Sequence, residues 1–184
     1  MSRKIGLYTG LLVLALAAVG ASLWFLFQPQ KVIEIPAGEP VIKMEETYIM
    51  AGRENTLSIY PDGFVLYTEI TGERPPGANT VKTWNTGKIS LEELNAVMAF
   101  LQNDVHFFEL EEEKLVSDRH ISDLLFTVSV SHNGVSKTAV ADGYFPPDSS
   151  QPYEKLPSPL DEIYSRLKGI AENDTAQVFR ETID

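Results

Sequence analysis

The chain has 184 residues, and its 15 basic and 26 acidic residues give a formal net charge of −11 at pH 7. Proteins that bind nucleic acids usually carry a basic patch or stripe, so this acidic sequence argues against a nucleic-acid partner. The chain contains no cysteine, which excludes disulfides, thiolate catalysis, cysteine metal ligands and lipid attachment through a cysteine.

The first 27 residues consist of a short basic segment, 1–4, followed by an uncharged apolar run, 5–27. A helix over 5–27 would be roughly 34 Å long, enough to cross a hydrocarbon layer of about 30 Å. The sequence therefore predicts a transmembrane helix that contacts membrane lipid, with Ile5, Leu12, Leu16, Trp24 and Phe27 among its residues. The positive charge at 1–4 favours a cytoplasmic amino terminus and a C-terminal domain outside the cell membrane.

A cleaved secretory signal is the alternative interpretation of this segment. The small residues before Ser22 allow cleavage near Ala21, after which the protein would be secreted. The apolar run nevertheless continues through Trp24 to Phe27, and aromatic side chains suit the outer membrane interface. We therefore favour retention as a single-pass anchor. A buried helix of a soluble fold is disfavoured because the run has no polar stripe.

Three further regions follow the apolar run. Residues 28–40 include three prolines and predict an extended stalk linker. Residues 41–172 are long enough for one extracytoplasmic domain with a single core. Residues 173–184 predict a polar C-terminal tail in which Val178 and Phe179 can dock as a short final segment.

The first half of the domain shows strand and turn patterns. Strands are predicted over 41–49, 56–60, 64–67 and 81–86, with 51–55 as a turn between the first two. The clearest hairpin follows from Pro61-Asp62-Gly63, because proline presets φ and glycine tolerates positive φ.

A helix is predicted next, followed by a hairpin and a second helix. Ser90 and Glu93 form a capping box for the first helix, which is expected to end near 103–104. Strands over 124–132 and 135–141 flank Asn133-Gly134, and a two-residue turn pairs Val130 with Lys137 and Val128 with Ala139. Ser158 caps the second helix. The predicted fold class is α+β, with a mainly antiparallel sheet of about five to six strands and two packed helices.

Residues 118–123 contain the catalytic candidates. His120 lies between Asp118 and Asp123. A histidine with nearby carboxylates is a set of side chains that general acid–base catalysis uses. Residues adjacent in sequence rarely form a complete site, and no nucleophile-elbow motif is present. Local hydrogen bonds that shape a loop before a strand explain the same residues more simply. The spacing of the three histidines indicates no metal site, and no phosphate-binding glycine motif indicates a nucleotide, so we expect no cofactor.

Two proline-rich loops are the binding candidates. Pro75 and Pro76 form one, and Tyr144 and Phe145 precede two prolines in the other, so each loop can present a recognition surface. The leading hypothesis is a non-catalytic extracytoplasmic domain that contacts an envelope protein. A small hydrolase or metal-dependent enzyme using the His120 loop, and an assembly factor of a membrane complex, are the alternatives.

The order of these motifs resembles a family of uncharacterised bacterial secreted and lipoprotein domains of unknown function. The resemblance covers about residues 57–170. It rests on the 57–67 hairpin, the 87–94 helix start, Phe107-Phe108, Ile121-Ser122-Asp123, and the closing hairpin and helix from 124 to 170. Members of that family often carry a cysteine pair before the first hairpin, which this chain lacks. The resemblance implies an outward-facing α+β domain and no catalytic residues.

Overall fold

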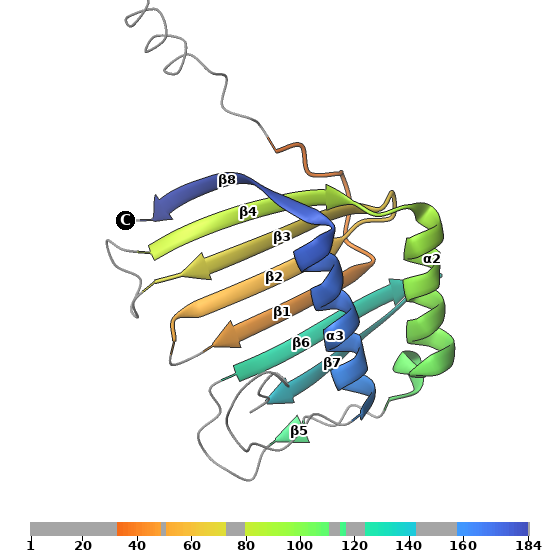
Figure 1. Ribbon diagram of the computed structural model, residues 1–184. Coiled ribbons are helices and arrows are strands. Elements are labelled where there is room, and N and C mark those ends of the chain that lie inside the picture. The colour runs from red at the N-terminus through yellow and green to blue at the C-terminus, as the bar shows by residue number, and fades with distance from the viewer. Residues whose placement is uncertain are drawn as a thin grey trace, which may run out of the picture. The chain divides into compact units, whose positions relative to one another are not determined.

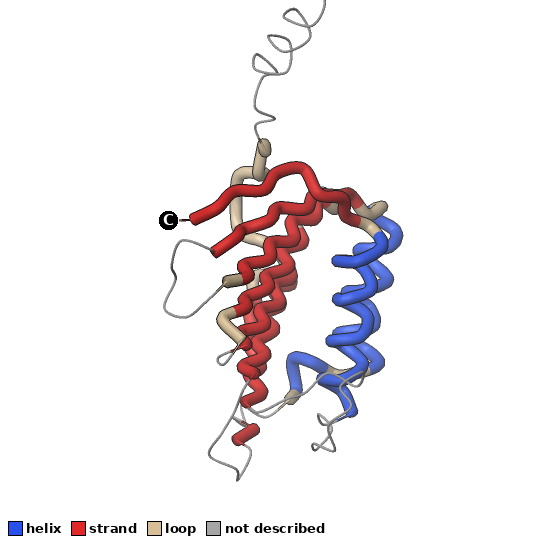
Figure 2. Tube along the Cα trace, turned by 60° about the vertical axis from the view of Figure 1, so that its left-hand side comes forward, coloured by secondary structure: helices blue, strands red, loops and turns tan. Residues whose placement is uncertain are grey.

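A computed structural model of the chain describes residues 33–48, 51–72, 80–110, 115–116, 124–142 and 158–183. These residues belong almost entirely to one compact unit, Glu34–Asp184. The unit is built on one sheet with helices on one of its faces (Figures 1 and 2).

Within the described residues, the sheet has eight strands in the order β5-β7-β6-β1-β2-β3-β4-β8. All neighbours are antiparallel except the short pair β5 and β7, which is parallel. The strands are β1 (Ile42–Tyr48), β2 (Arg53–Ile59), β3 (Phe64–Thr71), β4 (Thr80–Lys88), β5 (Leu115–Val116), β6 (Leu124–His132), β7 (Val135–Asp142) and β8 (Thr175–Ile183).

Both predicted tight turns are confirmed, and each depends on a residue with positive φ. Gly63 has φ +81°, and its N–H donates to the Tyr60 carbonyl at 2.9 Å in the turn between β2 and β3. Asn133 and Gly134 have φ values of 50° and 77°, as a type I′ turn requires. The predicted pairing of Val130 with Lys137 and of Val128 with Ala139 is also confirmed.

The first helix, α2 (Leu91–Ala99), begins at the predicted cap, where the Ser90 hydroxyl accepts a hydrogen bond from the Glu93 N–H at 3.0 Å. It continues as a π-helical segment (Phe100–Asp104) and a 3₁₀ turn (Phe107–Glu109). The second helix, α3, spans Ser158–Asn173.

Alternation along the strands places apolar side chains under the two helices and forms one hydrophobic core. Figure 2 shows α2 and α3 on the same side of the sheet. The buried residues from the sheet include Ile42, Met44, Leu57, Ile59, Val65, Phe126, Val128 and Val130, and those from the helices include Leu94, Val97, Met98, Leu160, Ile163, Tyr164, Leu167 and Ile170.

The predicted architecture requires correction. In the described part of the chain the sheet has eight strands and not five to six. Residues 175–183, predicted as a polar tail in which Val178 and Phe179 can dock, form the whole edge strand β8, and β5 adds a two-residue strand. Among the residues described here, no helix is long and apolar enough to cross a membrane. The segment predicted to do so, with Ile5, Leu12, Leu16, Trp24 and Phe27, lies outside the described residues.

Candidate functional site

Glu46 is the most unusual residue on the helix-bearing face of the sheet. It follows Ile42 and Met44 at a spacing of two along β1, so its side chain points to the same face as theirs. Glu46 is only 2% exposed. Burying a carboxylate costs several kcal/mol unless it is hydrogen-bonded, and such residues are rarely found inside without partners.

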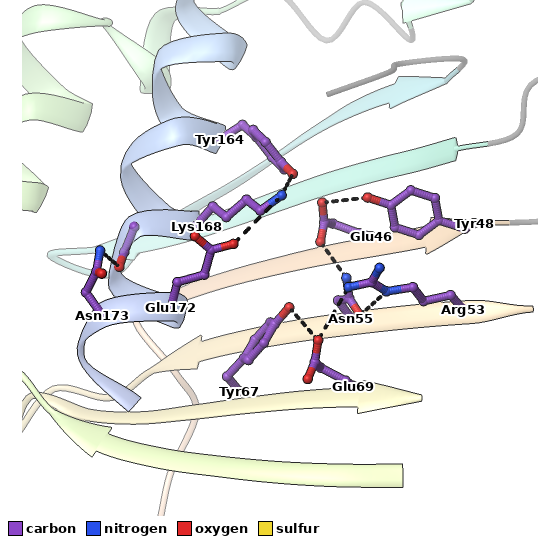
Figure 3. A network of polar contacts seen from close by, with 11 residues as sticks. Glu46, Tyr48, Arg53, Asn55, Tyr67, Glu69, Tyr164, Lys168, Glu172 and Asn173 are labelled. Atoms are coloured by element: carbon purple, nitrogen blue, oxygen red, sulfur yellow. Dashed lines mark hydrogen bonds and ion pairs between the residues drawn. The ribbon is translucent and has the colours of Figure 1, made fainter. Parts of the chain in front are cut away.

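Asn55 and Tyr48 supply these partners (Figure 3). The Asn55 Nδ2 donates to Glu46 Oε2 at 2.8 Å, and the Tyr48 hydroxyl donates to Oε1 at 3.3 Å. Asn55 lies on the neighbouring strand β2, opposite Glu46 in the register, and is only 3% exposed. Both carboxylate oxygens therefore accept a hydrogen bond inside the protein.

Arg53 and Glu69 form the outer part of the same group of residues. Arg53 donates from Nε to Asn55 Oδ1 at 3.3 Å and from Nη2 to Glu69 Oε1 at 3.4 Å. Its guanidinium carbon lies 5.6 Å from the centre of the Tyr48 ring, within the range of a cation–π contact. The Tyr67 hydroxyl also donates to Glu69 Oε1, at 3.4 Å. The side chains of Arg53 and Glu69 are 45% and 32% exposed.

We name this group the Glu46 network; it comprises Glu46, Tyr48, Arg53, Asn55, Tyr67 and Glu69. It extends from a buried carboxylate and amide to a partly exposed guanidinium and carboxylate. Three adjacent strands supply its residues, β1, β2 and β3. The inner hydrogen bond to Glu46 therefore orients the Asn55 side chain, whose Oδ1 accepts from Arg53.

Helix α3 borders the network with a second set of polar residues. The Tyr164 hydroxyl accepts a hydrogen bond from Lys168 Nζ at 2.8 Å. Lys168 Nζ also lies 4.0 Å from Glu172 Oε1, one helical turn further along (Figure 3). The Tyr164 ring packs edge-on against Phe126 of β6, so this residue joins helix α3 to the sheet beside the network.

The two tyrosines of the network resist ionisation. Burial, followed by the nearby Glu46 carboxylate, raises the pKa of Tyr48 from 10.0 to about 12, although Arg53 and Tyr164 act in the opposite direction. Burial and the Glu69 carboxylate also raise the pKa of Tyr67. Both hydroxyls therefore stay neutral, and able to donate hydrogen bonds, over the whole physiological pH range.

The six residues of the network supply hydrogen bonds, charge and aromatic surface. They include no serine, cysteine or histidine that could act as a nucleophile or as its base. In the described ranges, no group of three or more histidine, aspartate or glutamate residues could hold a metal ion. The arrangement is therefore suited to recognising a polar or charged group.

None of the site residues predicted from sequence belongs to the network. Asp118, His120 and Asp123, and the loop residues Pro75, Pro76, Tyr144 and Phe145, lie outside the described residues. The strands that flank these loops are described. Leu124 pairs with Tyr48, Asp142 pairs with Leu125, and Thr71 pairs with Val81. The three loop segments therefore connect to the sheet at the end where Tyr48 lies.

The other two histidines lie apart from the network. His106 has a left-handed backbone, and its Nδ1 is 3.7 Å from Glu109 in an exposed pair. His132 is half-buried, and its Nε2 contacts the Asn133 side-chain amide at the hairpin.

Sequence reasoning missed the Glu46 network, although one signal for it was present. A spacing of two from Ile42 and Met44 places Glu46 and Tyr48 on the inward face of the first predicted strand. An inward-facing glutamate is a buried polar group that needs an explanation.

Comparisons with known proteins give no independent indication of function. No family model matches the chain, and neither a curated protein nor a solved structure matches it. The resemblance to uncharacterised secreted and lipoprotein domains therefore stays a prediction.

Proposed function

We propose that this protein is a non-catalytic, extracytoplasmic binding domain and that it contacts its partner at the Glu46 network. The observation that carries the proposal is the support of an exposed Arg53–Glu69 pair by a buried hydrogen bond between Glu46 and Asn55. Such support holds the Asn55 acceptor beside this pair in a fixed geometry before a partner arrives, and this reduces the entropy lost on binding.

Stability alone is a poor explanation for these residues. An exposed ion pair such as Arg53–Glu69 contributes only about 0–1 kcal/mol. Replacing a buried polar group and its partner with apolar residues of similar shape is often neutral or stabilising. Glu46 and Asn55 thus occupy positions where leucine would serve the core equally well, which supports a role in recognition.

The sequence supports a location outside the cell membrane. Whether the N-terminal apolar run is retained or cleaved near Ala21, the residues after it would be exported. An envelope protein is the partner class that suits this location. Its contact with the Glu46 network would lie at the end of the sheet to which the loops with Pro75 and Tyr144 connect.

Photo-cross-linking in the native membrane tests the proposal. A photoreactive amino acid replaces Thr71, which is exposed and lies two residues after Glu69 on the same face of β3. The matched control is Val135, which is 59% exposed and starts β7 directly after the Asn133-Gly134 turn, at the opposite end of the sheet.

We expect a defined adduct with one partner from position 71, and little or none from position 135. The adduct at position 71 should also weaken when Glu69→Gln is introduced. Equal adducts from both positions, or no adduct at position 71 in a folded protein that is present in the membrane, would refute the proposed contact site.

A further inference from the structure

The Arg53 side chain occupies the Glu46 network in the way that a cationic ligand would. Its guanidinium lies over the Tyr48 ring and donates to an amide oxygen of Asn55 and a carboxylate oxygen of Glu69. An aromatic face next to carboxylate and amide acceptors is an arrangement that recognises guanidinium and alkylammonium groups. Arg53 thus indicates that the site accepts a guanidinium or alkylammonium group.

Acceptors remain available in the same place. Within the described part of the chain, Arg53 and Tyr67 both donate to Glu69 Oε1, so Oε2 retains its capacity to accept. Within the network the acidic residues Glu46 and Glu69 outnumber the one basic residue, Arg53, and on neighbouring α3 Lys168 is balanced by Glu172. The local balance therefore favours a cation over an anion.

Arg53 can be displaced at low cost. It is the first residue of β2, its side chain is 45% exposed, and its long flexible side chain can turn into solvent. Its contact with Glu69 is exposed, and exposed ion pairs and cation–π contacts are weak; its hydrogen bond to Asn55 is partly buried.

We propose that the binding partner inserts a lysine or arginine side chain into the Glu46 network and that Arg53 occupies this position until the partner displaces it. This inference rests on the proposed function and adds the chemical class of the group that is bound. It predicts that removal of Arg53 strengthens binding, whereas an Arg53 that contacted the partner directly would give the opposite result.

The experiment measures binding of N-acetyl-arginine amide to the full chain by NMR, followed through the signals of the Asn55 side-chain amide. N-acetyl-citrulline amide, which has the same shape without the charge, is the control probe. The test variant is Arg53→Ala, with Arg53→Gln as a second variant that keeps more of the side chain. Urea denaturation checks that each variant is folded.

Lys43→Ala is the matched control variant. Lys43 Nζ lies 2.7 Å from Glu45 Oε1. The two side chains are 40% and 41% exposed, so this ion pair is about as exposed as the one between Arg53 and Glu69. Both belong to β1, but they point to the face of the sheet opposite Glu46. Lys43→Ala therefore makes the same change in net charge, away from the network.

We expect Arg53→Ala to bind the arginine probe roughly two- to ten-fold more tightly than the wild type, which is the range of the weak contacts it removes. Lys43→Ala should leave the affinity unchanged, and Arg53→Ala combined with Glu69→Gln should lose the gain. An affinity that is unchanged or weaker in Arg53→Ala, or an equal gain in Lys43→Ala, would overturn the inference.

The two proposals fail in different ways. An adduct at position 71 without tighter probe binding in Arg53→Ala would refute the cationic group but keep the contact site. Tighter probe binding without an adduct at position 71 would refute the partner contact while retaining a cation site.

Discussion

Replacing Glu46 and Asn55, singly and together, measures how strongly the buried part of the network is coupled. Glu46→Leu removes the acceptor of Asn55 Nδ2 and of the Tyr48 hydroxyl. Since Asn55 is only 3% exposed, water cannot easily replace the lost acceptor. We expect a loss of about 1–3 kcal/mol in the free energy of unfolding, the usual cost of an unsatisfied buried polar group.

Asn55→Leu should be more damaging, because it leaves a charged group without its shortest hydrogen bond. Glu46 is 2% exposed, and the Tyr48 hydroxyl at 3.3 Å would be its remaining donor in the network. We expect a loss of about 3 kcal/mol or more. For a domain of this size that corresponds to a fall in Tm of about 6–12 °C.

The double variant Glu46→Leu/Asn55→Leu should lie within about 1 kcal/mol of the wild type, since neither polar group is then left alone. Urea denaturation of the full chain, followed by near-ultraviolet circular dichroism, gives the four free energies of the cycle. The expected coupling between the two residues is therefore at least about 3 kcal/mol. Additive losses, with coupling below about 0.5 kcal/mol, would show that Glu46 and Asn55 do not depend on each other.

Three other predictions test the fold and the titration of the network. Because the pKa of Tyr48 is raised to about 12, the folded state keeps a proton that the unfolded state loses near pH 10. The contribution of Tyr48 to stability is therefore present below pH 10 and is lost as pH rises towards 12. Urea denaturation across this range should show a smaller decline in the free energy of unfolding for Tyr48→Phe than for the wild type. Gly87→Ala should cost about 1–3 kcal/mol or more in the free energy of unfolding, because the new Cβ would lie 1.7 Å from the Asp174 carbonyl oxygen. Gly169→Ala, on a helix with room for the methyl group, should raise stability by up to about 1 kcal/mol in the same assay. A mild Gly87→Ala effect would contradict the close approach of β4 to the start of β8. Ser90→Ala should lower the free energy of unfolding by about 1 kcal/mol through loss of the helix cap, and an unchanged value would show that the cap hydrogen bond contributes nothing.

The sequence predicts the hairpins and helix starts well because each depends on a few neighbouring residues. Pro61-Asp62-Gly63 and Asn133-Gly134 adopt backbone conformations that few other residues accept, so they fix both turns and, in the second hairpin, the register. The Ser90 cap is equally local. These features require no knowledge of the distant parts of the chain.

Edge strand β8 escapes prediction because an edge strand has one neighbour and little need for apolar alternation. Val178 and Phe179 are adjacent in sequence, and the pairing with β4 shifts register between Trp84 and Asn85 at this point. The shift removes the regular spacing of two that identifies a strand. Contact of Phe179 with Trp84, with ring centres 5.1 Å apart, holds the strand in place, and this is a tertiary interaction.

The Glu46 network is hidden in the sequence for a related reason. Residues 51–55 are polar and predict a turn, whereas Arg53 and Asn55 belong to β2 in the structure. Their polar character reflects the network, which only the pairing of three strands brings together. The inward position of Glu46 was the one local sign of the network.

The most direct test of the central claim is the cross-linking yield at position 71 in the Glu46→Leu/Asn55→Leu background. This variant should remain folded while losing the buried support for Arg53 and Glu69. If the Glu46 network is the binding site, the adduct should fall roughly tenfold relative to the wild-type background, which corresponds to about 1.4 kcal/mol of binding free energy. An undiminished adduct from a folded double variant would show that the partner does not depend on the network and would contradict the proposed function.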